Sequence, residues 1–124
     1  MHLPPQDAVL LRIFIGEDDN CHGRPLYEAL VLKAREMGLA GATVLRGPMG
    51  VGPKTRRLHT AKILQLSTDL PMIVEIVDSE DHIKSYLDAI DPIMPSGLVT
   101  LEKATIIRYG KKSTSEPAGE GEYR

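Results

Sequence analysis

Two short stretches of the sequence are apolar at almost every position, and this property limits the folds available to the chain. Residues 8–15 read AVLLRIFI and residues 72–78 read MIVEIVD, and both are rich in the branched side chains that favour strands. Successive side chains of a strand point to opposite faces, so both faces of each predicted strand are largely apolar. A sheet built from these strands needs cover on both sides.

Two predicted helices lie between the strands. The first begins at Pro25 and ends at Gly38, because proline suits the first helical position and glycine the left-handed residue that closes a helix. The second is capped by Ser79 and ended by Pro92 and Pro95. Their apolar residues recur at helical spacing along one stripe each, so each helix covers a sheet with a single face.

The remaining segments complete a pattern of two halves. Strands are expected at residues 42–45 and 98–109, with a further strand or arm at residues 60–67. The order strand, helix, strand, long loop, strand, helix, strand predicts an α+β, ferredoxin-like antiparallel sheet with both helices on one face. The second apolar face would then be exposed, so we expect other copies of the chain to cover it in a closed homo-oligomer.

Charge and composition exclude several classes of protein. The 124 residues fit one domain, expected over residues 1–110, with a disordered tail over residues 111–124. A net charge of −2 argues against a nucleic-acid-binding protein. Cys21 is the single cysteine, and neither a signal peptide nor a membrane-spanning run is recognisable, so we expect a cytoplasmic protein without membrane insertion.

The most distinctive stretch is residues 38–59, GLAGATVLRGPMGVGPKTRRLH. No Asp or Glu occurs between Glu36 and Asp69, whereas five basic residues do, namely Arg46, Lys54, Arg56, Arg57 and Lys62. Glycines free backbone N–H groups to face a ligand, and the basic residues favour an anionic one. The alternative is a mobile surface loop, predicted over residues 46–59, whose glycines only make turns.

Known site motifs are not fulfilled. Gly47 and Gly52 have the spacing of a phosphate-binding P-loop, but Pro53 removes an N–H group that the motif needs. Cys21 has no partner cysteine, and the histidines show no metal-ligand spacing, so no metal site is expected. The acids of residues 17–19 are interpreted as a solvated loop rather than a Mg²⁺ site. Glu75, in the middle of a strand, is expected to pair with Arg12 or Arg108 within an oligomer interface.

Several of these segments resemble PII-type signal-transduction proteins. The matching segments are GLAGATV at residues 38–44, GVG at 50–52 and LPMIVEIV at 70–77. A closer similarity is to the PII-like domain-of-unknown-function family 190, through GE at 16–17, HGRPLYE at 22–28, LRG at 45–47, HT at 59–60 and VEIVD at 74–78. The resemblance extends over residues 8–110.

The resemblance implies a homotrimer with ligand clefts between subunits, an adenine nucleotide as effector, and a T-loop-like segment that engages a target protein such as a transporter, channel or enzyme. Gly41 and Thr43 would then lie near the base, Gly50 and Gly52 near the phosphates, and Arg108 would bind phosphate. The candidate binding residues are Gly41, Thr43, Arg46, Gly47, Gly50, Gly52, Lys54, Arg56, Arg57, His59, Gly97 and Arg108, with no catalytic residue or metal ligand among them.

The sequence also departs from the PII pattern. Pro95-Ser96-Gly97-Leu98 stands where PII proteins have a Gly-Asp-Gly-Lys turn, so the lysine that binds the phosphates and the acid are both missing. AMP, ADP or another small anion therefore fits better than ATP. The loop lacks the tyrosine that some PII proteins carry for nucleotidylation.

The leading hypothesis is a PII-like regulator without enzymatic activity. Two alternatives stay open. One is a small enzyme acting on phosphate or acyl phosphate with Arg46, Arg56, Arg57 and His59, and the other is a protein-interaction module that binds no small ligand.

Overall fold

The computed structural model describes residues 5–52, 55–60 and 69–110. For residues 51, 52 and 55–60 the description is of the backbone. The tail predicted at residues 111–124 and most of the arm predicted at residues 60–67 lie outside the described residues.

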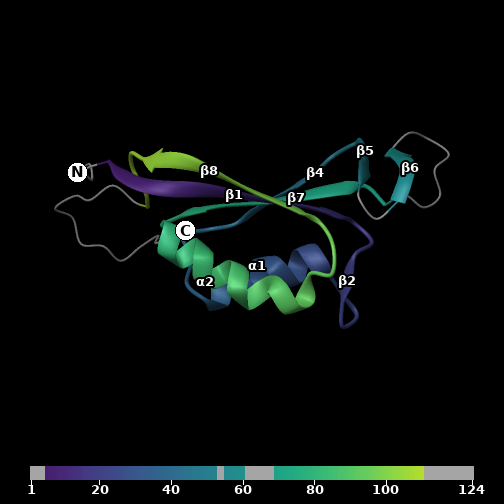
Figure 1. Ribbon diagram of the computed structural model, residues 1–124, viewed down its shortest axis with the longest axis horizontal. Helices are drawn as coiled ribbons and strands as arrows, with labels where there is room; N and C mark the ends of the chain where they lie inside the picture. Colours follow the sequence, from purple (N-terminus) through teal and green to yellow (C-terminus); the bar gives the residue numbers. More distant parts are fainter. Residues whose placement is uncertain (1–4, 53–54, 61–68, 111–124) are drawn as a thin grey trace.

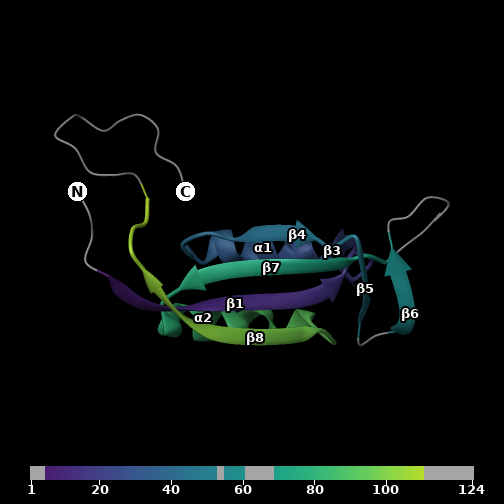
Figure 2. The same ribbon diagram turned by 90° about the horizontal axis from the view of Figure 1, so that it is seen from above.

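A four-stranded antiparallel sheet forms the centre of the chain. Its strands are β1 (Gln6–Gly16), β4 (Thr43–Arg46), β7 (Pro71–Asp78) and β8 (Leu98–Ile106), in the order β4-β7-β1-β8 (Figure 2). The helices α1 (Leu26–Glu36) and α2 (Glu80–Ile90) lie on the same side of this sheet (Figure 1). The predicted ferredoxin-like fold is therefore confirmed.

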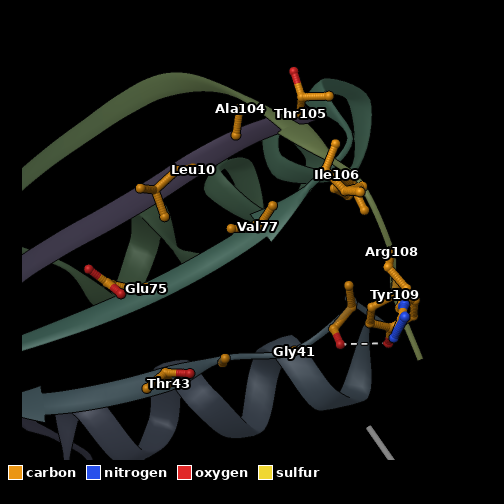
Figure 3. A pocket seen from close by; sticks show the side chains of 13 residues that line it. Leu10, Gly41, Thr43, Glu75, Val77, Ala104, Thr105, Ile106, Arg108 and Tyr109 are labelled. Atoms are coloured by element: carbon orange, nitrogen blue, oxygen red, sulfur yellow. Dashed lines mark hydrogen bonds between the residues drawn. The ribbon is translucent and has the colours of Figure 1, made fainter. Parts of the chain in front are cut away.

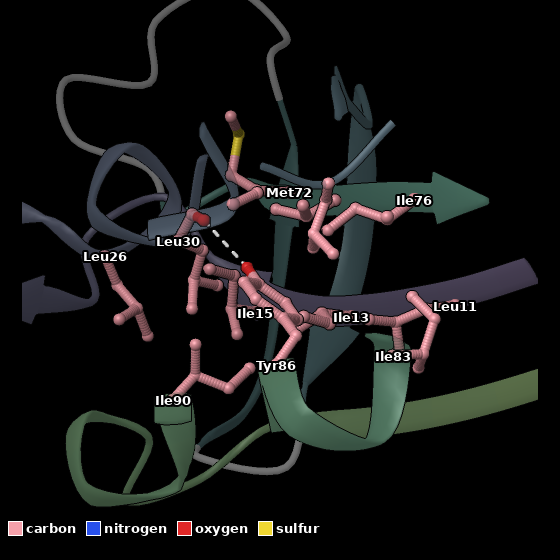
Figure 4. Close-up of a cluster of buried hydrophobic side chains, with 13 residues drawn as sticks. Leu11, Ile13, Ile15, Leu26, Leu30, Met72, Ile76, Ile83, Tyr86 and Ile90 are labelled. Carbon is pink, nitrogen blue, oxygen red and sulfur yellow. Dashed lines mark hydrogen bonds between the residues drawn. The ribbon is translucent and has the colours of Figure 1, made fainter. Parts of the chain in front are cut away.

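The face beneath the helices, here called the covered face, holds the core. Leu11, Ile13 and Val74 are fully buried there, because alternate side chains of the two central strands point at the helices. Tyr86 of α2 is also fully buried, and its hydroxyl donates to the carbonyl oxygen of Leu30 in α1 at 2.7 Å (Figure 4). Burial raises the pKa of the Tyr86 phenol well above its usual value, so the hydroxyl stays protonated and joins the two helices.

The opposite face, here called the open face, has no helix over it among the described residues (Figure 1). By strand register its side chains come from Leu10, Arg12 and Phe14 of β1, Ile73, Glu75 and Val77 of β7, Thr43 and Leu45 of β4, and Leu98, Thr100 and Glu102 of β8. Leu45 and Leu98 are 46% and 53% exposed. The expectation that the helices leave an apolar face exposed is confirmed for the single chain.

One charged cluster lies in the middle of the open face. The Nε of Arg12 donates to Glu75 at 2.8 Å, and its Nη1 lies 3.4 Å from Glu102. The hydrogen bond to Glu75 holds the pKa of Arg12 above its usual value. Arg12 is thus the partner of Glu75, and the pair forms within one chain rather than requiring a neighbouring copy.

One predicted boundary was wrong, and two short elements were not predicted. The last strand ends at Ile106 instead of residue 109, because Ile106 already pairs with Gln6, the first residue of β1. The polar segment before α1 contains a small hairpin of β2 (Asn20–Cys21) and β3 (Arg24–Pro25). After α2, a short 3₁₀ turn, η1 (Asp91–Ile93), takes in Pro92 before the chain leaves the helix direction.

The segment predicted as an irregular loop over residues 46–59 contains a second hairpin. Its strands, β5 (Met49–Gly52) and β6 (Thr55–Thr60), pair antiparallel with an irregularity between Gly50 and Gly52. The hairpin stands beyond one end of the main sheet (Figure 2). Sequence periodicity did not reveal it, because glycine and basic residues interrupt the alternation that normally marks a strand.

Candidate ligand pocket

A pocket of about 640 Å³ opens on the open face (Figure 3). It lies at the end of the sheet where β4 begins and β8 ends, away from the β5–β6 hairpin (Figure 2). One wall is the segment that leads into β4, and the other is the segment that leaves β8. It is lined by Leu10, Ala40, Gly41, Ala42, Thr43, Glu75, Val77, Ala104, Thr105, Ile106, Ile107, Arg108 and Tyr109. This volume lies in the range that holds small ligands and cofactors.

The lining is apolar with charge at two places. Leu10, Val77 and Ile106 supply aliphatic surface. Among the lining residues Arg108 is the one cation, and its side chain has no ion-pair partner among the residues that the structure describes. Glu75 is already paired with Arg12, so the unneutralised charge at the pocket is positive. An apolar body with an anionic group fits this arrangement.

Ala40 holds the first wall in place through both of its backbone groups. Its N–H donates to Oδ2 of Asp78 at 2.8 Å, and its carbonyl oxygen accepts from the Tyr109 hydroxyl at 2.7 Å (Figure 3). Asp78 is buried and also accepts from the Ser79 N–H and contacts Nδ1 of His82. Burial by itself raises the pKa of Asp78, but these hydrogen bonds outweigh it and hold the pKa below its usual value.

Gly41 and Thr43 lie in the first wall and Arg108 in the second, so three predicted site residues do meet in this pocket. A Cβ added at Gly41 would have no heavy atom within 4 Å apart from its chain neighbours. The described contacts of this chain therefore do not explain the glycine, and space beside it is open.

The other predicted residues gather at the far end of the sheet, around the base of the hairpin. Gly47 follows β4, and its N–H donates to the carbonyl oxygen of Pro71 at 2.8 Å. Added Cβ atoms at Gly47 and Gly50 would lie 2.8 and 2.9 Å from Cγ of Pro71. Packing within the single chain thus favours glycine at both positions, because the Pro71 ring occupies the space that a side chain would need.

Packing and backbone conformation also favour glycine at position 97. It precedes β8 with φ +129°, and an added Cβ would lie 3.0 Å from Met94 and 3.2 Å from Ile15. The start of β8 can approach the sheet this closely only without a side chain at this position.

Arg46 is not a free cation. Its Nη2 lies 2.6 Å from Oε2 of Glu17, so part of its charge is already neutralised. The expectation that residues 17–19 form a solvated acidic loop was wrong for Glu17, which pairs with Arg46, and for Asp19, which is buried and accepts from the Gly16 N–H at 2.9 Å. Asp18 is exposed as expected, and its N–H donates to Asp69 at 2.7 Å. These acids order the chain around the hairpin base.

The remaining predicted residues have a less complete description. Gly52, Arg56, Arg57 and His59 lie in β5 and β6, of which the backbone is described, and Lys54 lies outside the described residues. The single chain therefore brings together Gly41, Thr43 and Arg108 in the pocket, and Gly47 and Gly50 beside Pro71 next to Arg46. Gly97 precedes β8, at the opposite edge of the sheet from β4.

Sequence reasoning missed Tyr109, Leu10 and Val77 as pocket residues. Val77 and Leu10 were interpreted only as part of an apolar strand face, and Tyr109 as the last residue of a strand. Pairing of Leu10 with Val77 across β1 and β7 could not be deduced from either segment alone, because register depends on the whole sheet.

Residues 8–106 match the model of the family DUF190, described as Uncharacterized ACR. The chain belongs to DUF190. Two relatives of the chain carry the name UPF0166 protein. One, from Aquifex aeolicus, is 45% identical over 79% of this chain and 91% of its own length. The other, from Methanocaldococcus jannaschii, is 33% identical over 76% of this chain and 86% of its own length.

Solved structures place this DUF190 chain in the PII-like fold. CPII, a nitrogen regulatory PII-like protein from Thiomonas intermedia bound to ADP, AMP and bicarbonate, superposes with a TM-score of 0.63 at 16% identity, over 84% of this chain and 92% of CPII. A PII-like signaling protein from Thermus thermophilus gives a TM-score of 0.56 at 14% identity, over 85% of this chain and 94% of the other. At such identities the likeness concerns the fold.

In the part of the chain that the structure describes, no helix is long and apolar enough to span a membrane, and no cluster of His, Cys, Asp or Glu has metal-ligand geometry.

Proposed function

We propose that this DUF190 protein is a cytoplasmic PII-like regulator that binds an adenine nucleotide, AMP or ADP rather than ATP. The observation that carries the proposal is the pocket on the open face, apolar in its lining and with the single cation Arg108. Its size suits a nucleotide, and its charge suits a phosphate. The fold neighbour CPII, solved with ADP and AMP, supports the same ligand class.

The complete site belongs to an oligomer in this proposal, with a trimer as the expected form. Arg108 and the residues at the hairpin base lie at opposite ends of the sheet in one chain, so a nucleotide contacts both only where a neighbouring copy supplies the basic hairpin. The apolar open face supports such an assembly, because its exposed Leu45, Val77 and Leu98 would be buried in it.

Regulation would then pass through the hairpin segment. A nucleotide that favours one arrangement of residues 47–59 shifts the population of that arrangement, and a target protein such as a transporter, channel or enzyme binds it. Replacing Arg56 and Arg57 with Ala should weaken nucleotide or partner binding without unfolding the chain. Unchanged binding of both would count against this part of the proposal.

Native mass spectrometry with AMP, ADP, ATP and cyclic dinucleotides tests the ligand. We expect trimers that take up to three AMP or ADP molecules. Arg108→Gln should weaken binding about tenfold or more, because it removes a charge-assisted contact. A trimer that takes none of these nucleotides contradicts the nucleotide proposal and favours the interaction module.

Gly41→Ala is the sharper variant for the position of the ligand. The added methyl group meets no heavy atom within 4 Å in the chain, so the free energy of unfolding should change by less than about 1 kcal/mol. Nucleotide affinity should fall, because the methyl group projects beside the pocket. Gly50→Ala is the matched contrast: it clashes with Pro71 and should destabilise the fold.

The enzyme hypothesis needs Arg46, Arg56 and Arg57 to stabilise a phosphoryl group. It is weakened because Glu17 already pairs with Arg46. Steady turnover of ATP or acyl phosphate that His59→Ala abolishes would overturn the regulatory proposal.

A further inference from the structure

The two walls of the pocket are joined by one side chain. Tyr109 belongs to the segment that leaves β8, and its hydroxyl donates to the carbonyl oxygen of Ala40 in the segment that enters β4, at 2.7 Å (Figure 3). These residues are 69 positions apart in the chain. The hydrogen bond therefore links parts of the pocket that the sequence does not bring together.

Among the described residues, few other contacts hold the segment that carries Arg108. Strand pairing ends at Ile106, opposite Gln6 at the start of β1. Ile107 is 62% exposed, Arg108 is exposed, and Gly110 has a positive φ of +80°. A segment with no sheet partner among the described residues and with mostly exposed side chains samples many conformations. The tether at Tyr109 acts at the residue next to the pocket cation.

The acceptor of this tether is itself fixed. The Ala40 N–H is bound to the carboxylate of Asp78 at 2.8 Å, and Asp78 is a buried residue at the end of β7. Tyr109 is 45% exposed, so its ring lies outside the core. Its specific contact is the hydrogen bond from the hydroxyl to Ala40. The hydrogen bond between Tyr109 and Ala40 thus connects the weakly held segment after β8 to the buried end of β7.

We propose that Tyr109 is a positioning residue, which holds Arg108 at the mouth of the pocket so that it can contact the anionic part of a ligand. This inference rests on the proposed nucleotide binding. It assigns a task to a side chain whose hydroxyl hydrogen is already donated to Ala40 and so cannot be donated to a ligand.

Tyr109→Phe in the full chain removes the hydroxyl and keeps the ring. Loss of one hydrogen bond lowers the equilibrium constant for forming the tethered state by about threefold to tenfold, so ADP affinity measured by calorimetry should fall by up to about that factor. Tyr27→Phe is the matched control, because Tyr27 packs beside the core away from the pocket and should leave ADP affinity unchanged. Wild-type ADP affinity in Tyr109→Phe overturns the proposal.

A mutant cycle separates positioning from a general structural role. If Tyr109 acts through Arg108, adding Tyr109→Phe to Arg108→Gln should cause no further loss of ADP affinity. Losses that add in full show that Tyr109 acts elsewhere and overturn the proposal. In the ligand-free protein, ¹⁵N relaxation should show greater motion of residues 107–109 in Tyr109→Phe but not in Tyr27→Phe.

The outcomes also separate this inference from the proposed function. A wild-type protein that binds neither ADP nor AMP overturns both. If the wild-type protein binds ADP, and if Tyr109→Phe has the same ADP affinity and the same ¹⁵N relaxation as the wild type, only the role of Tyr109 is overturned.

Discussion

The two faces of the sheet are made from the same two central strands, yet they do different things. On the covered face Leu11, Ile13 and Val74 are fully buried by α1 and α2. On the open face Val77 and Leu98 remain 36% and 53% exposed, beside a charged cluster and a pocket. The comparison teaches that apolar residues in a strand do not by themselves identify the core of one chain. Those that the chain leaves uncovered indicate where something else binds.

Polar groups differ between the faces in the same way. Tyr86 beneath the helices has its hydroxyl satisfied within the core, whereas Arg12 on the open face lies between two carboxylates and keeps a third of its side chain exposed, at 34%. A buried polar group must find its partner in the chain, while an exposed one remains available to a neighbour.

The largest effect is expected from truncation on the covered face. Ile13→Ala should lower the free energy of unfolding by about 2–5 kcal/mol, because it opens a cavity among fully buried side chains. Leu101→Ala, at a position that is 49% exposed, should cost less than about 1 kcal/mol. Denaturant unfolding followed by circular dichroism measures both, and equal losses would remove the distinction between buried and exposed positions.

A charge on the open face tests whether copies of the chain cover it. Phe14→Lys places an ammonium group among Ile73 and Leu98, its register neighbours, and should convert the oligomer to smaller species at micromolar concentration. Met37→Lys makes a similar change at the exposed end of α1, 38% exposed, and should leave the assembly intact. Light scattering distinguishes the two, and an unchanged assembly in Phe14→Lys contradicts an interface on this face.

Acid should weaken the link between the covered face and the pocket wall. The pKa of Asp78 is lower in the folded chain than in the unfolded chain, where it is about 3.9. Its contribution to stability is therefore complete above that value and is lost as the pH falls through the folded pKa. Asp78→Asn should cost about 1–3 kcal/mol at pH 7 and should lose less stability than the wild type between pH 5 and about pH 2. Parallel pH profiles in the two proteins would refute this assignment.

The smallest effect concerns the tie between the helices. Tyr86→Phe keeps the ring in the core and removes the hydroxyl that reaches Leu30, so the free energy of unfolding should fall by about 1 kcal/mol. Thermal unfolding at fixed protein concentration measures the change. A loss as large as that of Ile13→Ala would mean that the hydroxyl, rather than the ring, dominates the contribution of Tyr86.

Much of the fold could be predicted from local patterns. Branched apolar runs identified β1 and β7, and Pro25, Gly38 and Ser79 marked helix ends within one or two residues of those observed. The hairpin β5–β6 escaped prediction, because glycines and basic residues hide strand alternation. The candidate site was predicted only in part. Gly41, Thr43 and Arg108 do meet, but the partners of Arg46 and Asp19 depend on contacts across the fold.

The sequence alone determined that the chain has two-faced strands and helices with one apolar stripe, because side-chain period and burial are local properties. It also determined that the hairpin segment is basic. The tertiary structure decided that Gly47 and Gly50 pack against Pro71 and that Gly41, in the pocket wall, stands beside open space. It also decided that Tyr109 reaches Ala40 and that Arg12 neutralises Glu75. Such contacts join residues far apart in the chain, and they follow from strand register, which the complete sheet sets at once.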